Sequence, residues 1–254
     1  MVMRFFAAVA SSTILLASAA LAEVKTESFD YKQGDTTLEG FIAYDDAKTG
    51  KRPGVLIFPQ WTGLSDHERD AARNLAKLGY VAMVADVYGK GVRPAPPKDS
   101  GVEMGKYMSN RPLLRARVKA GYETFSKRPE INASKIAVIG YCFGGTAALE
   151  AGRDGLPAAA IATFHGVLSN PTPDDAKNFK SPVLVLHGAE DAVVSAKEVE
   201  TFQAEMKAVK ADLQFNTYSG APHGFTQAGN YFNAKAAARS WNALQDLFKE
   251  TIDQ

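Results

Sequence analysis

Short runs of consecutive apolar residues alternate along the chain with longer segments in which apolar residues recur every three to four positions. The short runs are rich in β-branched residues, as expected for strands buried on both faces of a parallel sheet. The longer segments have helical periodicity. Regular alternation of strand and helix predicts one α/β domain, with a mostly parallel central sheet and helices on both faces, in three α/β/α layers. The expected central strands are residues 54–58, 80–87, 136–139, 158–165, 182–186 and 213–218.

The remaining segments add an edge hairpin and the helices. Residues 24–31 and 36–44 are predicted to be strands around the turn 32–35, forming an antiparallel hairpin at one edge. Ser65 and Glu68 have the spacing of a capping box and predict a helix that Gly79 ends. Residues 98–110 fit neither pattern, and 170–180 are predicted to be a loop. Further helices are expected after residue 142 and at 113–125, 196–210 and 231–252.

The segment 136–150 predicts a strand, a tight turn and a helix, with Gly140 and Gly144 on either side of Cys142. Gly-x-Cys-x-Gly is the nucleophile elbow Gly-x-Ser-x-Gly with sulfur in place of oxygen. A nucleophile on such a turn brings strand and helix backbones close together, which glycines two residues away permit. The alternative is a glycine-rich turn that holds a buried, inert cysteine.

The first 22 residues have the features of a cleavable signal peptide. Arg4 precedes an apolar run, and Ala20-Leu21-Ala22 is a small-residue cleavage signal. We therefore expect an exported, periplasmic mature chain that begins near Glu23 and forms one domain over residues 23–254. Without Arg4 the formal net charge of +1 becomes 0.

A neutral chain without basic clusters argues against nucleic acids and anionic membranes as partners, and favours a small-molecule substrate. We expect no stable membrane association, and a monomer or weak homodimer. The only cysteine, Cys142, excludes an internal disulfide. No Cys/His cluster has metal-site spacing and no glycine-rich loop has phosphate-binding form, so no cofactor is expected.

Cys142, Asp191 and His223 each follow a predicted strand, in the order nucleophile, acid, histidine. The carboxyl ends of parallel strands meet at one edge of a sheet, so these three side chains can converge. This is the order of catalytic triads in α/β-hydrolases. Glu190 is an alternative acid beside Asp191.

Several motifs together resemble the dienelactone hydrolase family, across essentially the whole mature chain. They are Leu78-Gly-Tyr-Val-Ala-x-x-Ala-Asp-Val-Tyr-Gly89, Gly140-Tyr-Cys-Phe-Gly-Gly145, His187-Gly-x-x-Asp191 and Gly220-x-x-His223-Gly-Phe225. The resemblance implies an α/β-hydrolase fold and hydrolysis of small esters or lactones through a thioester acyl-enzyme on a Cys-His-Asp triad.

By the same resemblance Cys142 is the nucleophile, His223 the base and Asp191 its partner. The backbone N–H groups of Phe143 and Trp61 are expected to form the oxyanion hole. Gln60, Phe225 and Gln227 are expected in the substrate pocket, which Trp61 could also line.

Two positions depart from the family pattern. The family has a glutamate that interacts with the cysteine where this chain has Gln60, and an arginine that binds a substrate carboxylate where it has Gln227. Neither amide carries charge, which argues against a carboxylated dienelactone as substrate. Arg93 and Arg111 are alternative cations for such a clamp. A fold that binds ligands with weak or no catalysis, and a thiol-dependent acyl transferase, are the alternative functions.

Other residues are assigned ordinary roles. His165 and His187 are expected to be structural and His67 to be solvated within its capping box. Trp241 is expected in the core. The sequon Asn132-Ala-Ser134 is interpreted as a turn or helix cap.

Overall fold

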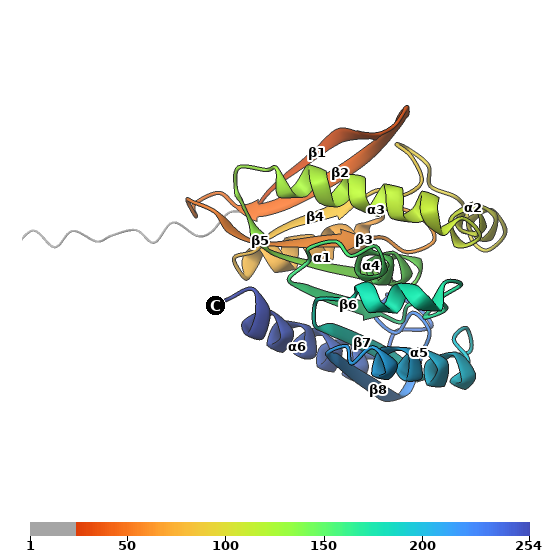
Figure 1. Cartoon of the computed structure of the whole chain (residues 1–254). Coiled ribbons are helices and arrows are strands. Elements are labelled where there is room, and N and C mark those ends of the chain that lie inside the picture. The colour runs from red at the N-terminus through yellow and green to blue at the C-terminus, as the bar shows by residue number, and fades with distance from the viewer. Residues whose placement is uncertain (1–23) are drawn as a thin grey trace, which may run out of the picture.

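A computed structural model describes residues 24–254, and the expected signal peptide lies outside them. The strands form one eight-stranded sheet in the order β1-β2-β4-β3-β5-β6-β7-β8 (Figure 1). β1 and β2 form the predicted antiparallel hairpin, β2 pairs antiparallel with β4, and all other pairs are parallel. The strands are β1 (Val24–Gln33), β2 (Thr36–Asp45), β3 (Arg52–Phe58), β4 (Val81–Ala85), β5 (Ile131–Tyr141), β6 (Ala160–Phe164), β7 (Val183–Glu190) and β8 (Leu213–Pro222).

Helices cover both faces of this sheet, which confirms the predicted three-layer α/β/α arrangement (Figure 1). Residues of α1 and α6 pack in the core on one face, and residues of α2, α3, α4 and α5 pack in the core on the other. The helices are α1 (Asp66–Lys77), α2 (Lys98–Met108), α3 (Arg111–Ser126), α4 (Phe143–Arg153), α5 (Ala196–Ala208) and α6 (Ala234–Thr251).

The central strands show why continuous apolar runs were needed. Along β3, Val55 and Ile57 face the core beneath α1 and α6, whereas Leu56 and Phe58 face the opposite core. Successive side chains of a strand point to opposite faces, so a strand covered on both sides must be apolar at every position. All four side chains are fully buried.

Some boundaries differ from the sequence prediction. The ambiguous region contains α2, whose Tyr107 is buried and donates a hydrogen bond to the carbonyl of Tyr88 at 3.1 Å. A short 3₁₀ helix, Pro173–Asn178, lies within the predicted loop. α6 begins at Ala234 rather than near residue 231, because the side chain of Asn233 accepts a hydrogen bond from the Ala236 N–H at 3.1 Å and caps the helix there. A tertiary contact therefore holds α2 in place, and a cap sets the start of α6.

Within residues 24–254, no helix is both long and apolar enough to cross a bilayer. The order of elements places β3, β5, β6, β7 and β8 side by side and parallel, so their carboxyl ends share one edge of the sheet. The loops that follow these strands contain the candidate catalytic residues.

Candidate active site

Cys142 occupies a strained turn between β5 and α4. Its φ is 53° and its ψ is −117°, a backbone conformation that few residues other than glycine adopt. A Cβ on Gly140 would overlap the backbone of Gly144, and a Cβ on Gly144 would overlap the carbonyl of Phe58. Glycine is therefore required at both positions, as the sequence pattern indicated. The turn lifts the cysteine above the edge of the sheet, where it is partly exposed.

The side chain of His223 connects Cys142 to Asp191. His223 Nε2 lies 3.1 Å from Cys142 Sγ, and His223 Nδ1 lies 2.9 Å from Asp191 Oδ2. Both distances are within hydrogen-bonding range. Cys142 and Asp191 lie 81 and 32 positions from His223 in the sequence, and the three side chains thus form one connected series of thiol, imidazole and carboxylate.

Asp191 is held ionised beneath His223. Its side chain is fully buried, and Asp191 Oδ1 accepts hydrogen bonds from the backbone N–H groups of Val193 at 2.8 Å and Val194 at 3.0 Å. Burial opposes ionisation, but the bonds from His223 and these N–H groups outweigh it and lower the pKa of the carboxyl. The neighbouring Glu190 is exposed, so Asp191 is the acid that contacts the imidazole.

The surroundings of His223 favour its protonated form. Burial disfavours the charge, but the hydrogen bonds to Asp191 and Cys142 together with their negative charge raise its pKa to about 10. Burial lowers the pKa of His187, whose Nδ1 lies 4.0 Å from Asp191 Oδ2. The electrostatics are those of an imidazolium held between a carboxylate and a sulfur.

Glu68 fixes the loop after β3, which contains Gln60 and Trp61. This fully buried carboxyl group accepts hydrogen bonds from the N–H of Gln60 at 3.3 Å and from the N–H and hydroxyl of Ser65 at 3.1 and 2.6 Å. Burial raises its pKa, against these hydrogen bonds. The carbonyl of Trp61 accepts a hydrogen bond from the Tyr88 hydroxyl at 3.0 Å. The capping box was recognisable in the sequence, but its contact with Gln60 was not.

Comparison with known proteins identifies the family. The model of the dienelactone hydrolase family matches residues 38–252. The chain belongs to the dienelactone hydrolase family. Members of this family hydrolyse carboxylic esters and lactones, and the protein is a hydrolase of that kind.

Two solved structures superpose over nearly the whole domain. The structure named m3DLH is 36% identical, covers 91% of this chain and 99% of its own, and has a TM-score of 0.87. A dienelactone hydrolase-like promiscuous phosphotriesterase, P91, from metagenomic libraries is also 36% identical, covers 90% of this chain and 98% of its own, and has a TM-score of 0.85. A protein of Yersinia pestis provisionally named carboxymethylenebutenolidase is 28% identical over 86% of this chain and 85% of its own.

The two positions that depart from the family pattern contact each other. Gln227 Nε2 donates a hydrogen bond to Gln60 Oε1. The two alternative cations are engaged elsewhere. Arg93 pairs with Glu39 at 3.1 Å, and the buried Arg111 donates to Ser169 at 3.3 Å. This member of the family therefore has a neutral amide pair at the two positions where its sequence departs from the expected pattern.

A second histidine, His165, packs against the ring of His223. His165 is 1% exposed, and its ring packs edge-on against His223 with 5.2 Å between centroids. His165 Nε2 lies 2.9 Å from Thr226 Oγ1. Burial and the charge of His223 keep the pKa of His165 well below its usual value, so its ring is neutral. Its place at a strand end was visible in the sequence, but its contact with His223 depends on the pairing of distant strands.

Two side chains differ from expectation, and a third has a role in addition to the expected one. Phe225 does not line a pocket, because its ring is fully buried in the core beneath α6 and packs against His165. His67 is half-buried rather than solvated, because its ring packs edge-on against Tyr141 with 4.7 Å between centroids. Trp241 packs against the core but also lines a cavity.

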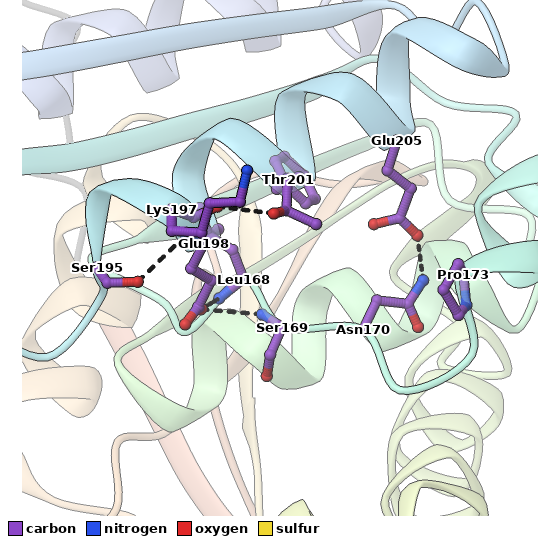
Figure 2. A pocket seen from close by; sticks show the side chains of 10 residues that line it. Leu168, Ser169, Asn170, Pro173, Ser195, Lys197, Glu198, Thr201 and Glu205 are labelled. Atoms are coloured by element: carbon purple, nitrogen blue, oxygen red, sulfur yellow. Dashed lines mark hydrogen bonds between the residues drawn. The ribbon is translucent and has the colours of Figure 1, made fainter.

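That cavity, of about 720 Å³, lies between α1 and α6 and includes Gln60 and Gln227 in its lining. Another cavity, of about 370 Å³, lies between α5 and the loop after β6 (Figure 2). There Glu198 accepts hydrogen bonds from the N–H groups of Leu168 and Ser169, and Asn170 bonds to Glu205. Because these polar groups bind each other, the second cavity is part of the packing of α5.

Proposed function

We propose that this member of the dienelactone hydrolase family cleaves small neutral esters or lactones through a thioester on Cys142. The observation that carries the proposal is the chain from Cys142 through His223 to Asp191, with distances of 3.1 and 2.9 Å. An imidazolium next to the sulfur stabilises the thiolate, which is the nucleophilic form of cysteine.

In the first half of the proposed reaction, the sulfur attacks the carbonyl carbon and the carbonyl oxygen becomes an oxyanion. The N–H groups of Phe143 and Trp61 are the proposed donors to this oxyanion. Phe143 is the first residue of α4, so its N–H has no carbonyl partner within the helix. When the tetrahedral intermediate collapses, the C–O bond breaks and His223 gives its proton to the leaving alkoxide. The acyl group remains on the sulfur.

In the second half, His223 takes a proton from water as the oxygen attacks the thioester. The carbon–sulfur bond breaks, the acid leaves and the thiolate–imidazolium pair is restored. Asp191 holds the imidazole through Nδ1, so that Nε2 faces the reacting atoms. The buried carboxylate of Asp191 also stabilises the ring whenever it carries the additional proton.

The neutral pair Gln60–Gln227 supports the assignment of neutral substrates. A substrate carboxylate placed there would lack a cation to pair with, and its desolvation would be uncompensated. We therefore favour neutral esters and lactones over carboxylated dienelactones.

The test is the turnover of p-nitrophenyl acetate by freshly reduced protein, beside Cys142→Ala and Cys142→Ser. Activity in the parent and its collapse in Cys142→Ala, together with a thioester adduct detected by mass spectrometry, is the expected result. Absence of turnover in the parent, or equal turnover in Cys142→Ala, would contradict the proposal and favour a binding function. Transfer of the acyl group to an added alcohol rather than to water would indicate an acyl transferase.

A second candidate activity is the hydrolysis of neutral phosphotriesters. It is favoured by the 36% identity to P91 and by the uncharged amide pair. Release of 4-nitrophenol from diethyl 4-nitrophenyl phosphate, lost in Cys142→Ala, is the expected result. Release that persists in that variant would exclude Cys142 from this reaction.

We also propose that the protein is exported after cleavage of residues 1–22. The basis is the sequence pattern of Arg4, an apolar run and Ala20-Leu21-Ala22. Expression of the full chain in a Gram-negative bacterium should yield a periplasmic protein whose first residue is near Glu23. An intact N-terminus in the cytoplasmic fraction would contradict it.

A further inference from the structure

The cavity between α1 and α6 opens at the same edge of the sheet as the catalytic residues. It measures about 720 Å³, within the range of small-molecule sites. The part of α1 from Asp66 to Asn74 and the first turns of α6 form its sides. Tyr141 and Phe164, the last residues of β5 and β6, contribute to its lining.

The lining excludes anions and favours apolar groups. It contains the aromatic rings of Tyr141, Phe164 and Trp241, and several alanines of α6. Among residues 24–254, the only formally charged side chains in the lining are those of Asp66 and Asp70, and none is a lysine or arginine. A negatively charged ligand would meet repulsion without a compensating cation, whereas a neutral hydrocarbon or aromatic group would gain by leaving water.

Four lining residues are close neighbours of catalytic residues in the sequence. Tyr141 precedes Cys142, Gln60 precedes Trp61, and Thr226 and Gln227 follow His223 by three and four positions. The cavity is therefore built from the same loops that position the nucleophile, the base and the proposed oxyanion donor.

Side-chain contacts also join the cavity to the triad. His67 Nε2, on the cavity wall, lies 3.5 Å from Thr226 Oγ1, which lies 2.9 Å from His165 Nε2. The ring of His165 then packs against His223. Thr226 and His67 in the cavity lining are thus two and three contacts away from the ring of His223.

The Gln60–Gln227 pair gives the cavity a polar group. The bond between the two amides uses one donor hydrogen and one acceptor. Each Gln side chain offers two donor hydrogens and one acceptor oxygen, so the pair retains further donor and acceptor capacity. This capacity can orient an ester group whose apolar part occupies the rest of the cavity.

From these observations we propose that the cavity between α1 and α6 binds the apolar acyl chain or ring of a neutral ester substrate. The inference rests on the proposed ester hydrolysis at Cys142, and it adds the place and the chemical class of the group that is recognised. It predicts a preference for longer or aromatic acyl groups over acetate.

The kinetic test compares p-nitrophenyl octanoate with p-nitrophenyl acetate. Ala238→Trp fills the cavity from α6, at an exposed position where the larger side chain is tolerated. Asn242→Trp, on the same helix, exposed and outside the lining, is the matched control. In Ala238→Trp, kcat/KM for the octanoate should fall by about tenfold or more, the effect of losing burial of roughly two methylene groups. The acetate and the control variant should change little.

A binding measurement keeps this inference separate from turnover. In Cys142→Ala, ethyl 4-nitrobenzoate should quench tryptophan fluorescence saturably, and 4-nitrobenzoate anion should not. Ala238→Trp should abolish the saturation, whereas Asn242→Trp should retain it. The protein could turn over p-nitrophenyl acetate while both tryptophan variants have equal effects, or while the ester and the anion bind equally. Either result would overturn the subsite but not the proposed hydrolysis. If no ester is turned over but the neutral ester still binds selectively, the proposed hydrolysis is overturned and the cavity remains as a binding site.

Discussion

The side-chain amide of Gln227 donates a hydrogen bond to the side-chain oxygen of Gln60, across 167 positions of sequence. The bond joins the loop after β3 to the loop after β8, on either side of the strands that carry Cys142 and Asp191. Glu68 holds the backbone of Gln60 from the other side. Two positions that carry charge in the family pattern are thus neutral here and satisfy each other.

The first prediction concerns this pair. Gln227→Arg places a guanidinium beside the site and should increase kcat/KM for esters with a free carboxylate by about tenfold relative to neutral esters, through a charge-assisted hydrogen bond. Steady-state kinetics with a neutral ester and a carboxylated ester of equal size would measure the ratio. Gln203→Arg, at an exposed position of α5, makes the same change in net charge and should leave the ratio unaltered. Equal ratios in both variants would show that Gln227 does not decide the charge preference.

A second prediction separates the two neighbouring acids. Asp191→Asn removes the charge beneath His223, and kcat for p-nitrophenyl acetate should fall by about 100-fold or more, because the imidazole loses its orientation and the partner of its charged form. Glu190→Gln removes an exposed carboxylate from the adjacent position and should change kcat less than about twofold. The reverse order of effects would make Glu190 the functional acid.

The third prediction is a pH dependence of stability. The pKa of His223 is about 10 in the folded protein, against about 6.5 for an unperturbed histidine in the unfolded chain. Its stabilisation is therefore complete below pH of about 6.5 and is lost as the pH rises through about 10. The difference in Tm between the parent and His223→Gln, measured from pH 6 to 10.5, should shrink as the pH increases.

His187 provides the opposite case. Burial lowers its pKa in the folded protein, so it opposes stability where the unfolded residue is protonated, below pH of about 6.5. His187→Gln should change the pH dependence of the Tm only below pH of about 6.5.

For the His223 prediction, a Tm difference between the parent and His223→Gln that stays constant across the alkaline range would contradict a raised pKa for His223.

The fourth prediction tests the turn at Cys142. In Gly144→Ala the new methyl group would overlap the Phe58 carbonyl and lie 2.6 Å from the Pro59 carbonyl oxygen. The free energy of unfolding in urea should fall by about 3 kcal/mol or more, since backbone must move. Gly101→Ala on α2, where a Cβ meets nothing within 4 Å, should instead stabilise by up to about 1 kcal/mol. Equal stability of the two variants would show that the elbow tolerates a side chain.

Much of the fold was predictable because local patterns report local structure. Apolar runs such as 54–58 and 182–186 had to be strands covered on both faces, and they are β3 and β7. The glycines around Cys142 predicted a close approach of strand and helix, and the backbone of Cys142 has the strained conformation of such a turn. The positions of Cys142, Asp191 and His223 after parallel strands predicted that they can converge, and their side chains do lie together.

Other features depended on contacts between segments far apart in the sequence. Nothing local to Phe225 indicates that its ring is buried in the core, while Trp241, expected in the core, lines a cavity. The pattern around His67 predicted an exposed helix start, but Tyr141 of β5 packs against its ring. Gln60 and Gln227 were each recognised as departures from a family pattern, but not as partners.

The sequence by itself determined the alternation of strands and helices, the sharp turn at Cys142 and the order of the candidate nucleophile, acid and histidine along the chain, because these follow from periodicity, glycine spacing and position after the strands. The tertiary structure decided which side chains line the cavity, which acid contacts His223 and how the neutral amides pair. Those outcomes depend on the sheet order β3-β5-β6-β7-β8, which brings loops from distant parts of the chain to one edge. Long-range packing of this kind leaves no periodic signal in the residues that take part in it.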